Sequence, residues 1–329
     1  MLRYSVCRKE LGAIFDAGKY DIVHVHTPIA AFMTRKVCAQ WKARHASKKP
    51  AVIYTVHGFH FFEGQTSRLS HTLFHTLEKR ALSWTDALVV MNNEDEIAAH
   101  KLQPSSPSTH IERIDGIGFD FACYENARLK RAQQTQDVAH QEIENRRVTH
   151  LCIIAEHNDN KDLALLFNAL ALLKNRGVTN FHLTVVGSGP LTDNLKVLAS
   201  QLKIDGLLTF TGQLGRIELD EVIENTDIGV LVSKREGLPR SLMEFCAAGA
   251  TIAGSATRGI VDEVRDTRAL AEKRTPECVG DMLQNLIEHP TLQREIAHAQ
   301  YQYAKAHFDL PQILAAYDAL YMHYLSEPK

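Results

Sequence analysis

The stretch of the 329-residue chain with the clearest chemical content is Ser233–Gly249, SKREGLPRSLMEFCAAG. It follows an apolar run, IGVLVS, that is typical of a buried strand, and a helical pattern begins near Arg240. Glu236 falls in the intervening loop, and Glu244 lies a turn into the predicted helix. Because a carboxylate accepts paired hydrogen bonds from vicinal hydroxyls, this arrangement favours binding of a ribose or hexose ring. The structural alternative is an acidic loop followed by a glutamate that stabilises the helix dipole.

The start of the same predicted helix is suited to a phosphate. The backbone N–H groups of Arg240, Ser241 and Leu242 would face the carboxyl end of the strand, where the helix dipole favours an anion. The loop residues Gly237 and Leu238 are predicted to line the same site. The sequence therefore predicts a site for a phosphorylated, hydroxyl-rich molecule.

A second glycine-containing turn, in VVGSGPL, stands between a predicted strand and a predicted helix. It contains Gly187, Gly189 and Pro190. Short glycine turns are common, so this one indicates a ligand site only through its place after a strand.

Histidine pairs are the candidates for a metal site. His24 and His26 alternate along a predicted strand, and His71 and His75 are one helical turn apart, so each pair could supply two ligands. The chain contains 17 histidines, so such pairs arise by chance. We predict no metal site.

Strands and helices alternate along most of the sequence, which predicts βαβ units and parallel sheets. We expect an α/β protein with two Rossmann-like domains that face a cleft. The predicted strands are Asp21–His26, Ala51–Val56, Ala87–Met91, Ile111–Ile114, Thr149–Ala155, Phe181–Gly187, Leu207–Thr211, Ile228–Ser233 and Thr251–Gly254.

Polar residues dominate Glu125–Arg147, so this stretch is predicted to be an exposed helix or linker between the domains. The expected division is a partial first domain over 1–121, a linker over 122–147 and a second domain over 148–308. The final 309–329 is predicted to be a helix that packs back on the first domain.

Composition and charge exclude several classes of protein. The chain is 45% hydrophobic, which excludes a disordered chain, and its net charge of −2 argues against a general nucleic-acid binder. No apolar run has the ~18 residues of a membrane span, and no signal peptide is recognisable. Six widely spaced cysteines suit a reducing compartment, so a cytoplasmic protein is expected.

One basic region suggests contact with a membrane surface. No acidic residue occurs between Asp21 and Glu63, and aromatic residues are interleaved with the positive charges there. The region could be a solvated helix face, or it could rest on anionic headgroups at the inner membrane face. The residues proposed for that contact are Arg35, Lys36, Lys42, Arg44, Lys48 and Lys49.

Several motifs in order carry a resemblance to a known family. REGLPRSLMEFCAAG resembles the signature of retaining GT-B glycosyltransferases of family 4, in their bacterial capsule and exopolysaccharide branch. YDIVHVHTP and YTVHGFHFFEG resemble the acceptor domain of that branch, and VVGSGPL its donor domain. The resemblance implies transfer from a nucleotide sugar, expected to be a UDP-sugar, to a saccharide or lipid-linked saccharide, with no metal required.

The resemblance also assigns roles to single residues. Glu244 would bind the ribose and Glu236 the donor sugar, while Arg240, Ser241 and Leu242 would face the phosphates. Lys161, in EHNDNKD, would neutralise the diphosphate leaving group. His57 would lie beside the sugar, and His60 and Phe59 would be on the acceptor side.

The chain departs from the family pattern at its start. It shows no opening strand with a glycine-rich loop, so about two βα units of ~30 residues each are expected to be missing. Their loss would leave the DIVHVH strand at an exposed sheet edge. Ala155 and Glu156 also stand where the family has glycine.

These departures leave two alternatives to an active transferase. The first is a truncated, non-catalytic relative that binds a nucleotide sugar or serves as a partner subunit. The second is a phosphorylase or sugar epimerase of similar architecture, against which the HGFHFFEG segment argues.

Overall fold

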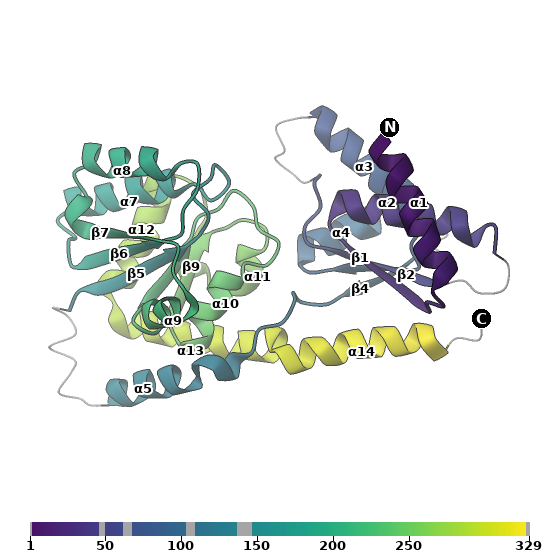
Figure 1. The fold of residues 1–329 in the computed structure, drawn as a ribbon. Helices are drawn as coiled ribbons and strands as arrows, with labels where there is room; N and C mark the ends of the chain where they lie inside the picture. Colours follow the sequence, from purple (N-terminus) through teal and green to yellow (C-terminus); the bar gives the residue numbers. More distant parts are fainter. Residues whose placement is uncertain (1, 46–49, 62–67, 103–108, 137–146, 327–329) are drawn as a thin grey trace. The chain divides into compact units, whose positions relative to one another are not determined.

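The computed structural model describes residues 2–45, 50–61, 68–102, 109–136 and 147–326 (Figure 1). Its backbone divides into two compact units. Unit 1 comprises Met1–Ile117 together with Pro311–Lys329, and unit 2 comprises Gly118–Leu310. Both units are built on a parallel β-sheet with helices on its two faces, as the alternation of strands and helices predicts.

Unit 1 contains a four-stranded parallel sheet in the order β1-β2-β3-β4, so β1 lies at one edge of the described sheet. In β2, Val52, Tyr54 and Val56 pack on one face, and Ile53 packs on the other. This alternation buries both faces of the sheet. The strands are β1 (Ile22–His26), β2 (Ala51–Val56), β3 (Ala87–Val90) and β4 (His110–Arg113).

Helices cover both faces of the unit 1 sheet. Residues of α1, α2, α3 and α4 pack against one face, and α14 packs against the other through Ile313 and Leu320. The bounds of these helices are α1 (Leu2–Ala17), α2 (Pro28–Lys42), α3 (Arg68–Leu82), α4 (Asn93–Leu102) and α14 (Leu310–Ser326).

Unit 2 contains a six-stranded parallel sheet in the order β10-β9-β8-β5-β6-β7. The strands are β5 (Thr149–Ile154), β6 (Phe181–Val186), β7 (Leu208–Gly212), β8 (Ile228–Leu231), β9 (Thr251–Ser255) and β10 (Leu270–Ala271). The order of connection reverses at β5, which pairs with β6 on one side and β8 on the other. In doubly wound sheets such a reversal places a ligand crevice at the carboxyl ends of the strands.

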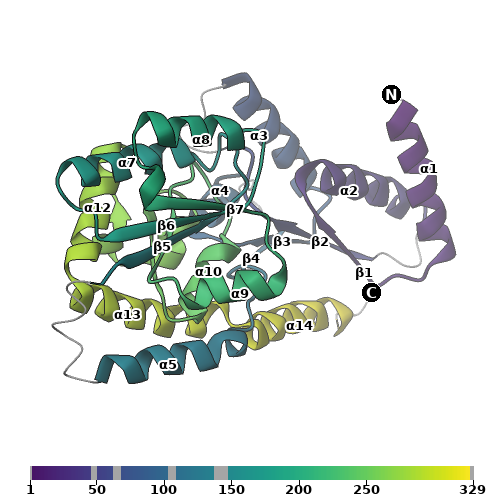
Figure 2. The same ribbon diagram turned by 60° about the vertical axis from the view of Figure 1, so that its left-hand side comes forward.

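The helices of unit 2 form two layers around one continuous core. Figures 1 and 2 show α7, α8 and α12 along one face of the sheet and α9, α10 and α13 along the other. The helices are α7 (Leu163–Asn175), α8 (Thr192–Gln201), α9 (Arg216–Glu224), α10 (Arg240–Ala247), α11 (Ile260–Val264), α12 (Pro276–Glu288) and α13 (Pro290–Phe308).

The segment that we expected to be an exposed helix or linker is helical over 125–136, and its described residues belong to unit 2. A short 3-10 helix, η1 (Phe121–Tyr124), buries Phe121 and Tyr124 in the core of that unit. It leads into α5 (Glu125–Gln136), where the Arg128 guanidinium lies 4.6 Å from the centre of the Tyr301 ring on α13. The division between the units therefore falls at Ile117 rather than in a separate linker, because aromatic residues after it join the core of unit 2.

Strand positions follow the sequence expectations to within a few residues, whereas one short α-helix and one short strand were not predicted. These are α11 and β10, which follow β9. Both are brief, and neither has a periodic apolar pattern long enough to be recognised.

The basic region of unit 1 differs from the predicted membrane-contacting surface. Arg35 is completely buried, where it donates to Glu78 at 2.8 Å and stacks on Tyr54. The prediction that Arg35 contacts a membrane is therefore wrong. Lys42 is paired with Asp86 at 3.0 Å. Lys48 and Lys49 lie outside the described residues.

Candidate functional site

The predicted donor-site residues of unit 2 gather at the carboxyl edge of its sheet. The loops after β8, β5 and β6 all begin at this edge, because these three strands are neighbours in the parallel sheet. Lys161 comes from the loop after β5, and Glu236 comes from the loop after β8. The topology thus brings together residues that are 75 positions apart in the sequence.

Lys161 and Glu236 form the central ion pair of this edge. The Lys161 Nζ donates to Glu236 Oε1 at 2.6 Å, with the side chains 21% and 12% exposed. The backbone N–H of Lys161 donates to Asn158 Oδ1 at 3.1 Å, which fixes the loop that carries the lysine. The pair spans the switch point between β5 and β8, so a cation and a carboxylate are both available to a ligand there.

The two glycines of the VVGSGPL turn allow a close backbone approach. Gly187 has φ 118°, and a Cβ on it would lie 2.1 Å from the carbonyl oxygen of Ala155. A Cβ on Gly189 would lie 2.6 Å from the carbonyl oxygen of His157. The turn after β6 therefore packs directly on the loop after β5, so any larger residue would displace the loop that leads to Lys161.

The start of α10 supplies fewer phosphate-facing groups than predicted. The Leu242 N–H donates to the Pro239 carbonyl at 3.0 Å, and the Leu242 side chain is buried in the core. Leu242 therefore offers a phosphate neither its side chain nor its N–H. The described contacts leave the N–H groups of Arg240 and Ser241 available, as expected for the first turn of a helix.

Glu244 is nearly buried on α10 and is held by two arginines. Its Oε1 accepts from Arg216 Nη1 at 3.0 Å and from Arg240 Nε at 3.3 Å. Arg216 in turn contacts Asp220 and Tyr124. Sequence reasoning missed Arg216, Asp220 and Tyr124, because nothing in the local pattern marks them as partners of a carboxylate on another helix.

In unit 1 the candidate residues also lie at the carboxyl edge of the sheet. His26 ends β1 and His57 follows β2, and a hydrogen bond of 3.0 Å joins His26 Nδ1 to His57 Nε2. Burial lowers the pKa of His57 below 6.5, and the neighbouring His26 lowers it further. Both rings are therefore mainly neutral at pH 7, so one imidazole donates to the other.

The backbone around these histidines is strained. Thr27 has φ 60°, a left-handed value that a β-branched residue rarely adopts. Gly58, next to His57, has φ 116°. Non-glycine residues with such φ values cluster at functional sites, so Thr27 supports a role for this edge of the sheet, whereas Gly58 adopts its φ without strain.

The acceptor-side prediction is corrected at Phe59. The Phe59 side chain is 3% exposed and belongs to the core of unit 1, where its ring lies 4.7 Å from that of Phe61. It therefore packs the sheet instead of facing a ligand. His60 is exposed, with its ring 5.2 Å from that of Phe74.

Two other features of the described residues bear on the predictions. No group of three or more histidine, cysteine, aspartate or glutamate side chains in the described part of the chain is arranged to hold a metal ion. Among the same residues, no helix is long and apolar enough to cross a bilayer.

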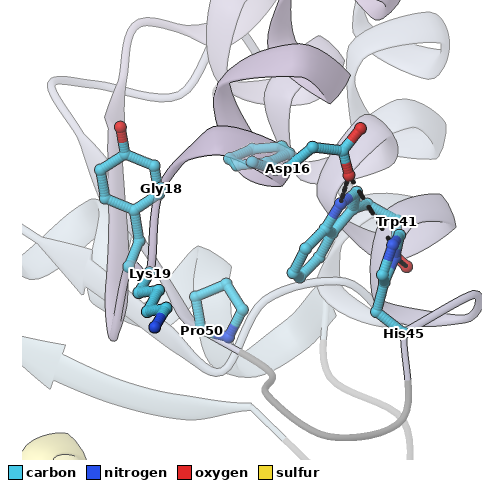
Figure 3. A pocket seen from close by; sticks show the side chains of 8 residues that line it. Asp16, Gly18, Lys19, Trp41, His45 and Pro50 are labelled. Carbon is cyan, nitrogen blue, oxygen red and sulfur yellow. Dashed lines mark hydrogen bonds and ion pairs between the residues drawn. The ribbon is translucent and has the colours of Figure 1, made fainter.

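A pocket of about 390 Å³ lies at the opposite, amino-terminal edge of the unit 1 sheet (Figure 3). It is lined by residues just before β1 and β2, among them Lys19 and Pro50. The Trp41 indole donates to Asp16 at 2.7 Å and stacks on His45 along one wall. None of the predicted site residues lines this pocket.

Two family models match the chain. Glycosyl transferases group 1 matches residues 135–307, and Glycosyltransferase Family 4 matches residues 2–112. The group 1 match covers more than half of the chain and contains the candidate residues Lys161, Glu236 and Glu244. The chain therefore belongs to the group 1 glycosyl transferases.

Curated relatives are moderately similar. The chain is 31% identical over 260 residues to the putative glycosyltransferase EpsD of Bacillus subtilis, a match of 78% of this chain and 64% of EpsD. It is 23% identical over 249 residues to the Escherichia coli UDP-Gal:alpha-D-GlcNAc-diphosphoundecaprenol alpha-1,3-galactosyltransferase, covering 75% of this chain and 58% of that protein. The chain thus spans less than two thirds of the length of both relatives.

Solved structures share the fold. Sucrose-phosphate synthase from Thermosynechococcus elongatus has a TM-score of 0.76 at 16% identity, covering 98% of this chain and 78% of that one. Anabaena HepE in complex with UDP and glucose has a TM-score of 0.71 at 16% identity, covering 97% and 80%. These likenesses confirm the predicted GT-B fold of two α/β domains with parallel sheets.

Proposed function

We propose that the protein is a retaining glycosyltransferase that moves a sugar from a UDP-sugar to a saccharide or lipid-linked saccharide in surface-polysaccharide synthesis. The observation that carries the proposal is the Lys161–Glu236 pair at the β5–β8 switch point, in the same unit as the exposed start of α10. A cation, a sugar-binding carboxylate and a helix N-terminus are the groups that a nucleotide-sugar donor requires.

The names of relatives support the choice of substrates. The Escherichia coli relative is named for a UDP-galactose donor and a diphosphoundecaprenol-linked acceptor. The HepE structure contains UDP and glucose. A UDP-sugar and a lipid-linked saccharide are therefore the first substrates to test on this protein.

In the proposed reaction the bond between the anomeric carbon and the diphosphate oxygen breaks. The acceptor hydroxyl oxygen bonds to that carbon on the same face, and its proton passes to the departing diphosphate. Lys161 and the N-terminus of α10 would stabilise the negative charge that develops on the diphosphate, an effect that is usually the largest single contribution to catalysis. On this proposal no metal ion is needed for that step.

We also propose that the protein is cytoplasmic and contacts an anionic membrane peripherally. Arg35 is excluded from this contact because its side chain is buried. Arg44 is exposed two residues after the end of α2, whereas Lys36 and Lys42 lie within that helix and Lys42 is paired with Asp86. Sedimentation with phosphatidylglycerol vesicles would test this contact. Arg44→Ala should weaken the binding, and either a parent protein that does not sediment with the vesicles or binding unchanged by this substitution would contradict the proposed contact.

The experiment that tests the proposed function has two stages. Calorimetry with UDP, GDP and ADP should show binding of UDP in preference to the others. UDP release from UDP-glucose, UDP-galactose and UDP-N-acetylglucosamine is then measured with a GlcNAc-diphospho-lipid acceptor, and the anomeric configuration of the product is read by NMR.

Each result of this experiment distinguishes the candidate functions. Transfer with retained configuration supports the proposal, and inverted configuration contradicts the retaining mechanism. Binding of UDP without release of UDP from any sugar donor would favour a non-catalytic relative. Release of sugar 1-phosphate from a polymer with phosphate, or an epimerised sugar, would favour a phosphorylase or an epimerase.

A further inference from the structure

The two oxygens of the Glu244 carboxylate have different surroundings. Oε1 accepts from both Arg216 and Arg240, which occupies both of its lone pairs. No described hydrogen bond or ion pair uses Oε2. The side chain is only 7% exposed, so the carboxylate has little freedom to rotate and exchange its oxygens.

Arg216 is itself fixed from two sides. Its Nε and Nη2 meet the two oxygens of Asp220 at 3.0 and 2.7 Å, which is the bidentate geometry that orients a guanidinium. Its Nη2 also donates to the Tyr124 hydroxyl at 2.6 Å. Tyr124 in turn donates its own proton to Asp220.

Tyr124 anchors this arrangement to the core of unit 2. It is 1% exposed and belongs to η1, whereas Arg216 and Asp220 belong to α9 and Glu244 to α10. Burial raises the pKa of the Tyr124 hydroxyl, and its hydrogen bond to Asp220 raises it further, so Tyr124 remains a neutral donor. Tyr124 of η1 thus fixes Arg216 of α9, which in turn contacts Glu244 of α10.

Arg240 is held less firmly than Arg216. Its side chain is 61% exposed, and among the described residues its side chain makes a polar contact with Glu244 alone. Arg240 can therefore turn toward a phosphate at the start of α10 without loss of the bond between Arg216 and Glu244. Arg216, which is also held by Asp220 and Tyr124, is therefore the more firmly fixed partner of the carboxylate.

We propose that Arg216, oriented by Asp220 and Tyr124, is a positioning residue that fixes Glu244 so that Oε2 faces the vicinal hydroxyls of the donor nucleotide. This inference rests on the proposed function, because it assumes a ribonucleotide at Glu244. Tyr124 lies outside both matched regions, 2–112 and 135–307, so this support is separate from the family signature.

The test compares UDP with 2′,3′-dideoxy-UDP, which keeps the phosphates and lacks the diol. Arg216→Ala should weaken UDP binding about tenfold, the size expected for hydrogen bonds to a charged group. It should leave dideoxy-UDP binding unchanged within about twofold, a change close to the thermal energy. Arg216→Lys should lose less UDP affinity than Arg216→Ala, since lysine keeps the positive charge but lacks the planar, bidentate guanidinium group.

Two further variants complete the design. Tyr124→Phe removes only the hydroxyl, so it should produce a smaller loss with the same selectivity for UDP. Arg176→Ala is the matched control, because Arg176 forms an exposed ion pair with Asp281 elsewhere in unit 2 at 2.7 Å. It should bind both nucleotides as the parent does.

The outcomes separate this inference from the function on which it rests. Equal UDP affinity in Arg216→Ala and in the parent would overturn the positioning role and leave the proposed function intact. Parallel loss of both nucleotides with a lower melting temperature would show a merely structural role, which also overturns it. A parent protein that binds neither nucleotide would overturn the proposed function together with this inference.

Discussion

The carboxyl edges of the two sheets present different chemistry. In unit 2 the candidate side chains are charged and paired, with Lys161 on Glu236 and Arg216 on Glu244. In unit 1 they are imidazoles whose lowered pKa keeps them neutral, and His26 and His57 are joined by a hydrogen bond. The charged edge of unit 2 is therefore suited to hold an anion, whereas the edge of unit 1 is suited to neutral hydrogen bonding.

The largest expected effect concerns the charged edge. Lys161→Met keeps the aliphatic stem and removes the cation, so the proposed UDP release should slow by about 10²–10³, as for loss of one group that stabilises developing charge. Steady-state kinetics of UDP release measures it. UDP binding should change less than kcat, because the charge develops as the bond to the leaving group breaks.

A neighbouring ion pair provides the control for Lys161. Lys234 and Asp159 come from the same two loops and are also 2.6 Å apart, but their side chains are 41% and 89% exposed. Lys234→Met should retain near-parent activity, because an exposed pair contributes little. Equal losses in the two variants would show that general loop charge, and not Lys161, carries the effect.

The next effect concerns the neutral edge. His57→Ala should lower kcat/KM about tenfold to a hundredfold without changing UDP affinity, since it removes one positioned hydrogen-bonding group. Kinetics and calorimetry on the same preparation measure the two quantities. A loss of UDP affinity as large as the loss of rate would break the division of roles between the two edges.

The pH dependence of the neutral edge follows from its lowered pKa values. The pKa of His57 lies below 6.5. The neutral imidazole, which we expect to be the active form, becomes protonated as the pH falls through that pKa. The acidic limb of the pH–rate profile should therefore begin below pH 6.5. It should be absent or shifted in His57→Gln, and an unchanged limb would assign it to another group.

A smaller effect on stability is expected from His24. Burial, followed by the charges of His26 and His57, lowers the pKa of His24 to about 4. Because the unfolded state then binds more protons, the contribution of His24 to stability is complete above pH 6.5 and is lost as the pH falls toward 4. After allowance for partial exposure, we expect a loss of about 1–2 kcal/mol.

The measurement for His24 is urea unfolding at pH 7 and pH 4.5. His24 bonds Tyr321 of α14 at 2.7 Å and Thr55 of β2 at 2.8 Å, so His24→Gln keeps polar groups there and removes the titration. The difference between the two pH values should shrink in the variant. An undiminished difference would mean that other groups titrate.

The smallest effect is expected from metal removal. On the proposed mechanism Lys161 and α10 stabilise the leaving diphosphate, so EDTA treatment should change the rate of UDP release by less than about twofold, a change close to the thermal energy. Readdition of Mg²⁺ or Mn²⁺ should likewise have little effect. Loss of activity with EDTA and its return with Mn²⁺ would contradict this expectation.

Local patterns in the sequence predict much of the fold. The alternation of apolar runs and helical stretches gives the strands of both sheets, because strand and helix periodicity are properties of consecutive residues. The spacing of Glu236 and Glu244 likewise places one carboxylate in a loop and one in a helix without reference to the rest of the chain.

Predictions about exposure were less reliable than predictions about secondary structure. Arg35 reads as a surface charge, yet it is buried because Glu78, 43 residues away, neutralises it. Phe59 and Leu242 read as ligand-facing because of their motifs, yet both complete a hydrophobic core. A charge or an apolar group can be placed only when its partners are known.

Consecutive residues alone predict the α/β class, most of the strands and helices, and the places of Lys161 and Glu236 in loops after strands and of Glu244 within a helix. Only the tertiary structure decided that Lys161 meets Glu236, that Arg216 and Tyr124 support Glu244, and that α14 returns to the sheet of unit 1. The reason is the separation along the chain between the residues that interact. Backbone periodicity is set by neighbouring residues, whereas these pairings depend on the order of strands in the sheet and on chain segments as much as 297 residues apart.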